Sequence, residues 1–188
     1  YGTAPSNADC FASSWSQGLT VEGMNVLVID TNVLLDVWVF DDPRAQALRE
    51  ALHARQINWL TTPAMREEWL RVLHYPHLHA RWTRKALSLD QLMAHFDQST
   101  VVADAPRAPW VCKDPDDQKF VDLAVAHASG HESGVQLISK DFEVLRMKKR
   151  LAQSGVAVLD QWQATAAQDT MLEGVSLGES NSSKVLRA

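Results

Sequence analysis

The stretch from Val26 to Asp36 (Val-Leu-Val-Ile-Asp-Thr-Asn-Val-Leu-Leu-Asp) constrains the fold of this chain more than any other. It opens with a run of β-branched and apolar residues, which is typical of a parallel strand buried on both faces. Asp30, Thr31 and Asn32 follow at once, and the apolar pattern then resumes at helical spacing. Polar residues placed there lie at the carboxyl edge of a sheet, where open α/β folds bind their ligands. We therefore expect Asp30 to belong to a functional site.

Strand and helix patterns alternate along the rest of the chain, which favours an α/β fold. We expect Pro76 to close the third helix. The predicted strands are 25–29, 57–61, 100–103, 135–139 and 156–159, and the predicted helices are 32–39, 43–55, 63–74, 83–97, 116–129 and 142–153. Strands separated by helices predict a three-layer α/β/α sandwich with a central parallel sheet.

The two ends of the chain lack this pattern. Residues 1–23 are rich in Ser, Gly and Ala, and Met24 stands directly before the first strand. We expect an unstructured or added leader over 1–23, one folded domain over 24–163 and a flexible tail over 164–188. We also expect a cytoplasmic protein without a membrane span, because the chain has no long apolar run, no signal peptide and no CxxC pair.

The charge neither excludes nor supports a nucleic-acid substrate. The chain has 18 Lys and Arg against 23 Asp and Glu, a net charge of −5. Residues 24–163 hold 16 basic and 18 acidic residues, a net charge of −2. If four of those acids bound cations, the remaining side chains of the domain would carry +2, so a phosphodiester substrate stays open.

Glu68 is the second candidate acid. With about 100° between successive residues of a helix, Glu68 lies some 40° outside the apolar stripe that includes Met65 and Trp69, and Glu67 points to the opposite side. Glu68 can therefore lie along the sheet edge, whereas Glu67 should be solvated. The alternative is that both acids belong to an ordinary helix surface.

Two further acids follow in Asp114-Pro-Asp-Asp117 and in Ser139-Lys-Asp141. Asp117 falls on the helix face that packs on the sheet, and Asp141 follows an apolar strand as Asp30 does. Both positions also suit simple helix caps, which remains an alternative reading. Four carboxylates brought together would repel one another unless a cation lay between them, and ligand sets made only of oxygen suit Mg²⁺ or Mn²⁺.

These ordered motifs resemble those of the PIN domain, a family of metal-dependent ribonucleases that includes many toxins of bacterial toxin–antitoxin pairs. The resemblance covers about residues 24–163 and rests on Ile29-Asp-Thr-Asn-Val-Leu34, Glu68-Trp-Leu-Arg-Val-Leu73, Asp114-Pro-Asp-Asp-Gln-Lys-Phe120 and Ser139-Lys-Asp-Phe142. The third motif departs from the commonest toxin pattern and matches a subfamily of toxins, and it leaves Asp114, Asp116 and Asp117 partly interchangeable.

The resemblance implies that the first strand lies beside the fourth. It also implies that Asp30, Glu68, Asp117 and Asp141 are the catalytic acids and hold Mg²⁺ or Mn²⁺, with Thr31, Asn32, Asp114 and Ser139 in support. The implied reaction is the hydrolysis of RNA phosphodiesters, the implied partner is a cognate antitoxin, and a homodimer is expected.

Several interpretations remain open at this point. Arg71, Arg81, Arg84 and Lys85 are candidate RNA contacts, as is a second basic cluster over 146–150, although solvated helix faces explain both. Trp82 and Trp110 could stack on bases, but a tryptophan is more often part of a core. A phosphatase with an aspartate nucleophile would require an acid where Asn32 stands. A non-catalytic module that binds RNA or a protein is the main alternative function.

Overall fold

The structure, a computed structural model, describes residues 25–129 and 134–163. Its five strands form one parallel sheet in the order β3-β2-β1-β4-β5. The strands are β1 (Asn25–Ile29), β2 (Ile57–Thr61), β3 (Thr100–Val102), β4 (Val135–Ile138) and β5 (Val156–Leu159). Each predicted strand is confirmed to within one residue, and so is the position of the first strand beside the fourth. The expected leader and tail lie outside the described residues.

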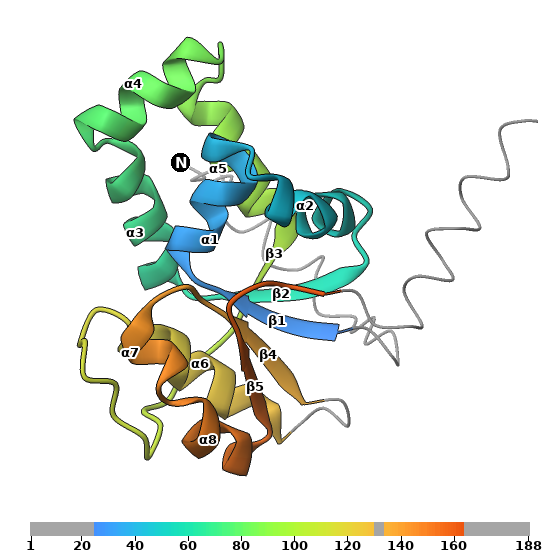
Figure 1. The fold of residues 1–188 in the computed structure, drawn as a ribbon, viewed down its shortest axis with the longest axis vertical. Helices are drawn as coiled ribbons and strands as arrows, with labels where there is room; N and C mark the ends of the chain where they lie inside the picture. Colours follow the sequence, from blue (N-terminus) through green and yellow to red (C-terminus); the bar gives the residue numbers. More distant parts are fainter. Residues whose placement is uncertain (1–24, 130–133, 164–188) are drawn as a thin grey trace, which may run out of the picture.

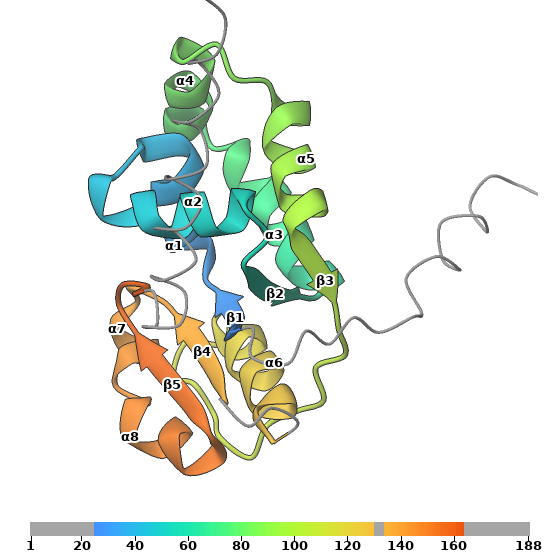
Figure 2. The ribbon, with the colours of Figure 1, turned by 90° about the vertical axis from the view of Figure 1, so that its right-hand side faces the viewer.

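Helices cover both faces of this sheet, which confirms the three-layer α/β/α sandwich (Figures 1 and 2). One side carries α1 (Thr31–Leu35), α2 (Gln46–His53), α3 (Pro63–Leu73), α4 (Pro76–Arg84) and α5 (Leu89–Ser99). The other side carries α6 (Gln118–Ala128), α7 (Phe142–Leu145) and α8 (Lys148–Leu151). Along β1, Leu27 and Ile29 join the core of the first side, while Val26 and Val28 join the second. No helix in the described ranges is long and apolar enough to cross a bilayer.

The first predicted helix, 32–39, changes its form halfway. α1 ends at Leu35, and a π-helical turn, η1 (Asp36–Phe40), continues it to Asp41, whose backbone is left-handed with φ 51°. This turn buries Val37, Trp38 and Val39. Because an α-helix and a π-helix both turn an apolar run toward the core, the sequence pattern did not distinguish them.

The predicted helix 63–74 is confirmed to within one residue as α3, which ends before Pro76. The sequence analysis missed that Pro76 also begins a new helix, α4, at a position where a proline loses no helical hydrogen bond. The predicted single helix 83–97 is in fact two elements, the end of α4 and the separate helix α5. A capping box formed by Ser88 and Gln91 starts α5. The predicted helix 142–153 is likewise divided into α7, α8 and a 3-10 turn, η3 (Ala152–Ser154). Within the predicted helix 43–55, a second 3-10 turn, η2 (Pro43–Ala45), precedes α2.

We predict that Gly134→Ala destabilises the fold more than the matched change Gly155→Ala. Both glycines have positive φ, 68° and 76°, so both substitutions carry the left-handed penalty of roughly 1–2 kcal/mol. A Cβ at position 134 would also lie 2.5 Å from the Gly155 carbonyl oxygen, whereas one at 155 meets Ala128 at 3.5 Å. Urea unfolding should show an additional loss of about 1 kcal/mol or more for Gly134→Ala, because the backbone must shift. Equal losses would contradict the close approach of the two turns.

Candidate active site

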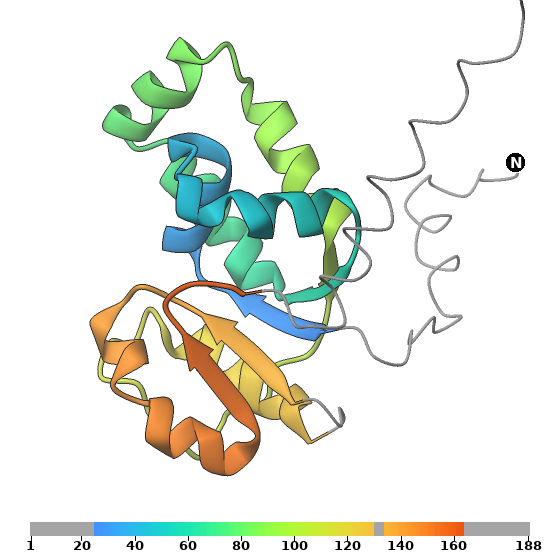
Figure 3. The ribbon, with the colours of Figure 1, turned by 45° about the vertical axis from the view of Figure 1, so that its right-hand side comes forward.

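Four acids from four different elements gather at the carboxyl edge of the sheet. Asp30 follows β1 and Asp141 follows the neighbouring strand β4, while Glu68 lies on α3 and Asp117 directly precedes α6. Figure 3 shows the end of β1 between the helices of the two sides. The charges of Asp30 and Asp141 both raise the pKa of Asp117, and the charge of Glu68 raises that of Asp30. The structure therefore brings the four predicted acids into one electrostatic environment.

Asp30 is buried and held by directed hydrogen bonds. Its Oδ2 accepts from Ser139 Oγ at 2.5 Å and from Asn32 Nδ2 at 2.9 Å. Its Oδ1 accepts from the backbone N–H of Asn32 at 3.2 Å, which caps α1, and the next residue, Thr31, is buried in the first turn. Burial raises the pKa of Asp30 above its usual value, and the bonds from Ser139 and Asn32 offset this only in part.

Ser139 connects the two acids at the strand ends. Besides donating to Asp30, its hydroxyl oxygen accepts the backbone N–H of Asp141 at 3.0 Å. The Asp141 carboxylate accepts the N–H of Glu143 at 2.7 Å and so caps α7. Asp30 and Asp141 are therefore both helix caps and members of the acid cluster. The two interpretations of such residues are compatible, because a carboxylate can accept several hydrogen bonds.

Asp117 is the least satisfied acid of the cluster. It precedes α6 without capping it, and its Oδ2 is buried with no hydrogen-bond partner among the described residues. Burial, followed by the charges of Asp30, Asp141 and Asp114, raises the pKa of Asp117 to about 7. Asp114 and Asp116 are exposed, and Asp114 accepts the N–H of Asp116 at 2.9 Å. Of the three acids in this motif, Asp117 is the one directed at the cluster.

Lys119 supplies a positive charge within the cluster that the sequence analysis did not single out. Its ammonium pairs with Glu68, also donates to the carbonyl oxygen of Asp116, and lies 4.5 Å from the centre of the Phe120 ring. The two side chains of the Lys119–Glu68 pair are only 20% and 15% exposed, whereas Glu67 is exposed to solvent as expected. The charge of Lys119 lowers the pKa values of Asp30 and Asp117. The only sequence signal for this role was the position of Lys119 two residues after Asp117.

The donor set fits a hard divalent cation in its chemistry, although the side chains are not closed around one. Among the described residues, no three Asp, Glu, His or Cys side chains converge closely enough to hold a metal ion as they stand. Lys119 engages Glu68 in the structure, and Ser139 and Asn32 engage Asp30. The ligands are nevertheless all oxygens, and Asp117 presents a buried oxygen without a partner, which suits Mg²⁺ or Mn²⁺.

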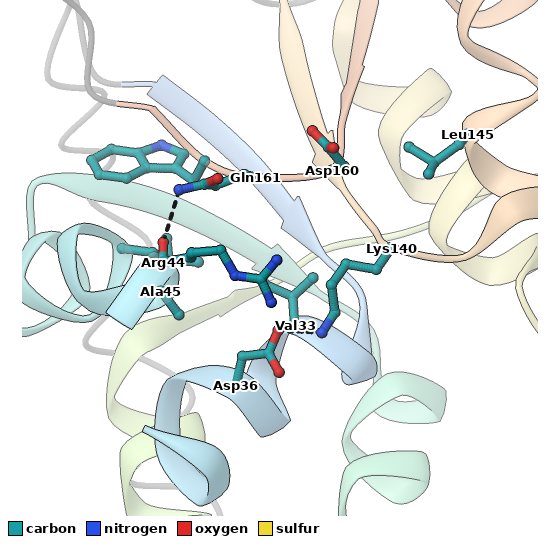
Figure 4. Close-up of a pocket in the computed structure, with 10 residues that line it drawn as sticks. Val33, Asp36, Arg44, Ala45, Lys140, Leu145, Asp160 and Gln161 are labelled. Atoms are coloured by element: carbon teal, nitrogen blue, oxygen red, sulfur yellow. Dashed lines mark hydrogen bonds and ion pairs between the residues drawn. The ribbon is translucent and has the colours of Figure 1, made fainter. Parts of the chain in front are cut away.

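A cavity of about 230 Å³ adjoins the cluster beyond Lys140. Figure 4 shows Arg44 and Lys140 reaching toward Asp36 from opposite sides, and Lys140 forms an ion pair with the buried Asp36. Arg44 is held by Asp42 at 2.7 Å, and Asp160 also lines the cavity. Two acids and two cations line this cavity, and both cations are paired with acids, so the cavity offers a phosphate little attraction. The ion pair with Asp36 instead holds Lys140 in place, and Lys140 lies between Ser139 and Asp141 in the chain.

The predicted basic contacts are distributed unevenly. Arg71 is exposed on α3, three residues after Glu68. The other three lie at the end of α4, which Figure 1 shows far from α6 and α7, and each is engaged within the chain. Arg81 stacks on Phe40, Arg84 donates to a helix carbonyl, and Lys85 pairs with Asp41. Trp82 is buried, and Trp110 is half-buried and donates to Ser154, so neither presents a free ring face as a base platform would.

Comparison with known proteins adds a family. A family model described as a PIN domain matches residues 26–130, more than half of the chain. The matched range includes Asp30, Glu68 and Asp117 and ends before Asp141, which the structure places next to Asp30 through the β1–β4 pairing. No curated protein matches the chain.

We predict that Asp117→Asn stabilises the metal-free protein more at pH 8 than at pH 5. An unfolded aspartate loses its proton near pH 4, whereas folded Asp117 keeps it to about pH 7, so the folded state binds more protons between these values and loses stability as the pH rises. After allowance for solvent screening of this half-exposed group, the difference in unfolding free energy between Asp117→Asn and wild type should grow by about 1–2 kcal/mol from pH 5 to pH 8. Urea unfolding in a chelator measures it, with the exposed Asp116→Asn as control. A difference independent of pH would contradict the charge crowding.

Proposed function

The chain belongs to the PIN domain family, a family of nucleases, and from this premise we propose that it is a divalent-metal-dependent endoribonuclease. The observation that carries the proposal is the buried oxygen of Asp117, which has no partner among the described residues and feels the charges of Asp30 and Asp141, while Glu68 acts on Asp30. We further propose that it acts as the toxin of a toxin–antitoxin pair and works as a homodimer. Both of these remain predictions from the family.

The four acids would be the ligands of Mg²⁺ or Mn²⁺. Such an ion, when bound, lowers the pKa of a water molecule and offsets charge on the attacked phosphate. The chain itself orients the acids. Ser139 and Asn32 fix the carboxylate of Asp30, and the α7 cap fixes that of Asp141. Burial of Asp30 and Asp117 excludes water from one side of the site, which strengthens every electrostatic interaction there.

Lys119 changes its role in this scheme. In this proposal Glu68 releases the Lys119 ammonium when it binds the ion, because that ammonium neutralises the charge of Glu68 in the structure. The released ammonium would remain close to the cluster, because α6 carries both Lys119 and the adjoining Asp117. A lysine there would bind a phosphate oxygen of the strand being cut, as lysine commonly does in phosphate sites.

The same Lys119–Glu68 pair favours one alternative, a non-catalytic PIN module that binds RNA or a protein. In that case Lys119 would balance the acids permanently, and no divalent ion would be needed. The two functions differ in a direct observation. The nuclease cuts RNA in Mg²⁺ or Mn²⁺, whereas the module leaves every RNA intact with either ion.

We predict that Glu68→Gln lowers kcat/KM for RNA cleavage by at least about 100-fold, because it removes a ligand charge, whereas Glu67→Gln changes it less than twofold. Both residues lie on α3, but only Glu68 contacts the cluster. Asp117→Asn and the exposed Asp116→Asn make a second matched pair. Cleavage of a labelled RNA in Mg²⁺ or Mn²⁺ measures the effect, with circular dichroism to verify folding. Equal activity of the two members of each pair would exclude the proposed site.

We also predict that Mg²⁺ or Mn²⁺ stabilises the wild-type fold and that a chelator reverses this. A ligand present at about 100 times its dissociation constant stabilises a fold by about 2.7 kcal/mol, which raises Tm by several degrees in a domain of this size. Asp117→Asn should lose most of the shift because it removes the unpartnered oxygen. Thermal unfolding with and without each ion measures it, and the same Tm shift in the variant would contradict ligation by Asp117.

A further inference from the structure

Phe142 is a large apolar side chain that the fold leaves in solvent. Phe142 is 67% exposed. It directly follows Asp141 and is the first residue of α7. The folded chain gains little from an apolar ring in this position, since the hydrophobic effect rewards removal from water. The other aromatic residues considered for base contacts, Trp82 and Trp110, are turned into the protein.

One cation stacks on this ring, since the Arg146 guanidinium lies 5.4 Å from the ring centroid. Glu143, the next residue after Phe142, pairs with Arg146 at 3.3 Å and with Lys113 at 3.4 Å, and the side chains of these two cations are 57% and 77% exposed. Further along the chain, Lys148, Lys149 and Arg150 of α8 are exposed as well. The residue that follows Asp141 therefore combines an exposed aromatic ring with a stacked cation, and a second exposed cation is held by its neighbour Glu143.

We propose that Phe142 is a stacking platform for a base of single-stranded RNA beside the acid cluster, with Arg146 and Lys113 contacting the phosphates of that strand. Proteins that bind single strands combine these two features, aromatic rings that accept any base and basic residues that follow the backbone. The inference rests on the proposed nuclease function, and it identifies the substrate as an unpaired strand.

The chemistry of the surface favours RNA over a protein partner. The cores of protein interfaces are depleted of charged residues, whereas Phe142 contacts Arg146 and adjoins Glu143, which holds Arg146 and Lys113. The stacked Arg146 also prepares the ring for a base, because it restricts one approach and leaves a positive charge at the edge of the site.

The test measures binding of labelled single-stranded oligouridine by fluorescence anisotropy, in a chelator and at low ionic strength, where no hydrolysis competes. Phe142→Ala and Phe142→Leu should weaken binding by about 5- to 150-fold, because both remove the aromatic face, whereas Phe142→Trp should retain it. Replacing the RNA with oligo(dihydrouridine), whose rings are not planar, should abolish the difference between wild type and Phe142→Ala. Tyr75→Ala, which removes another exposed aromatic ring away from the acids, is the control and should have no effect.

Each outcome decides the proposal. Equal affinity of wild type and Phe142→Ala for oligouridine would overturn it, as would equal losses on both oligomers or a wild type that binds neither. A change in oligomeric state of Phe142→Ala on size-exclusion chromatography, with RNA affinity unchanged, would assign the ring to a protein contact instead. Cleavage assays separate this test from the nuclease proposal. If the wild type binds RNA through Phe142 but cuts none, the stacking proposal stands and the nuclease proposal is wrong.

Discussion

Repulsion between gathered carboxylates is the constraint that shapes this site. The parallel pairing of β1 and β4 brings Ser139 to Asp30, Ser139 also accepts the N–H of Asp141, and Asp117 is added from the start of α6. The Lys119 ammonium and the hydroxyl and amide donors of Ser139 and Asn32 offset part of this repulsion. One oxygen, Asp117 Oδ2, remains unanswered among the described residues. A site with this imbalance is prepared for a cation, because a cation satisfies all the acids at once.

The sequence predicted the features that depend on strongly periodic segments. The strands were identified because apolar β-branched runs between polar turns have few other interpretations. Asp30 and Asp141 followed from their place after such runs, and the geometry of an α-helix separated Glu68 from Glu67. Helical phase also favoured Asp117, on the assumption of a helix from 116, but α6 begins only at Gln118 and all three acids of the motif precede it, so phase alone could not separate Asp117 from Asp114 and Asp116.

Other features depend on contacts that no local pattern encodes. Pro76 reads equally well as the end of one helix or the start of the next, and the structure uses it as a start. The pairing of Lys119 with Glu68 joins α6 to α3 across the sheet edge, and the exposure of Phe142 depends on how far neighbouring loops extend over α7. Phe142 appeared in a motif only as a hydrophobic residue after Asp141, so its open face became visible only in three dimensions.

The hydrogen bond from Ser139 to Asp30 joins residues that are 109 positions apart. A ribosome adds about 5–20 residues per second, so Asp30 emerges roughly 5–20 seconds before the strand that completes its surroundings. During that interval the nascent chain has neither β4 nor Asp141, and its first acid lacks the hydroxyl that orients it. The acid cluster is therefore complete only when almost the whole domain has been synthesised.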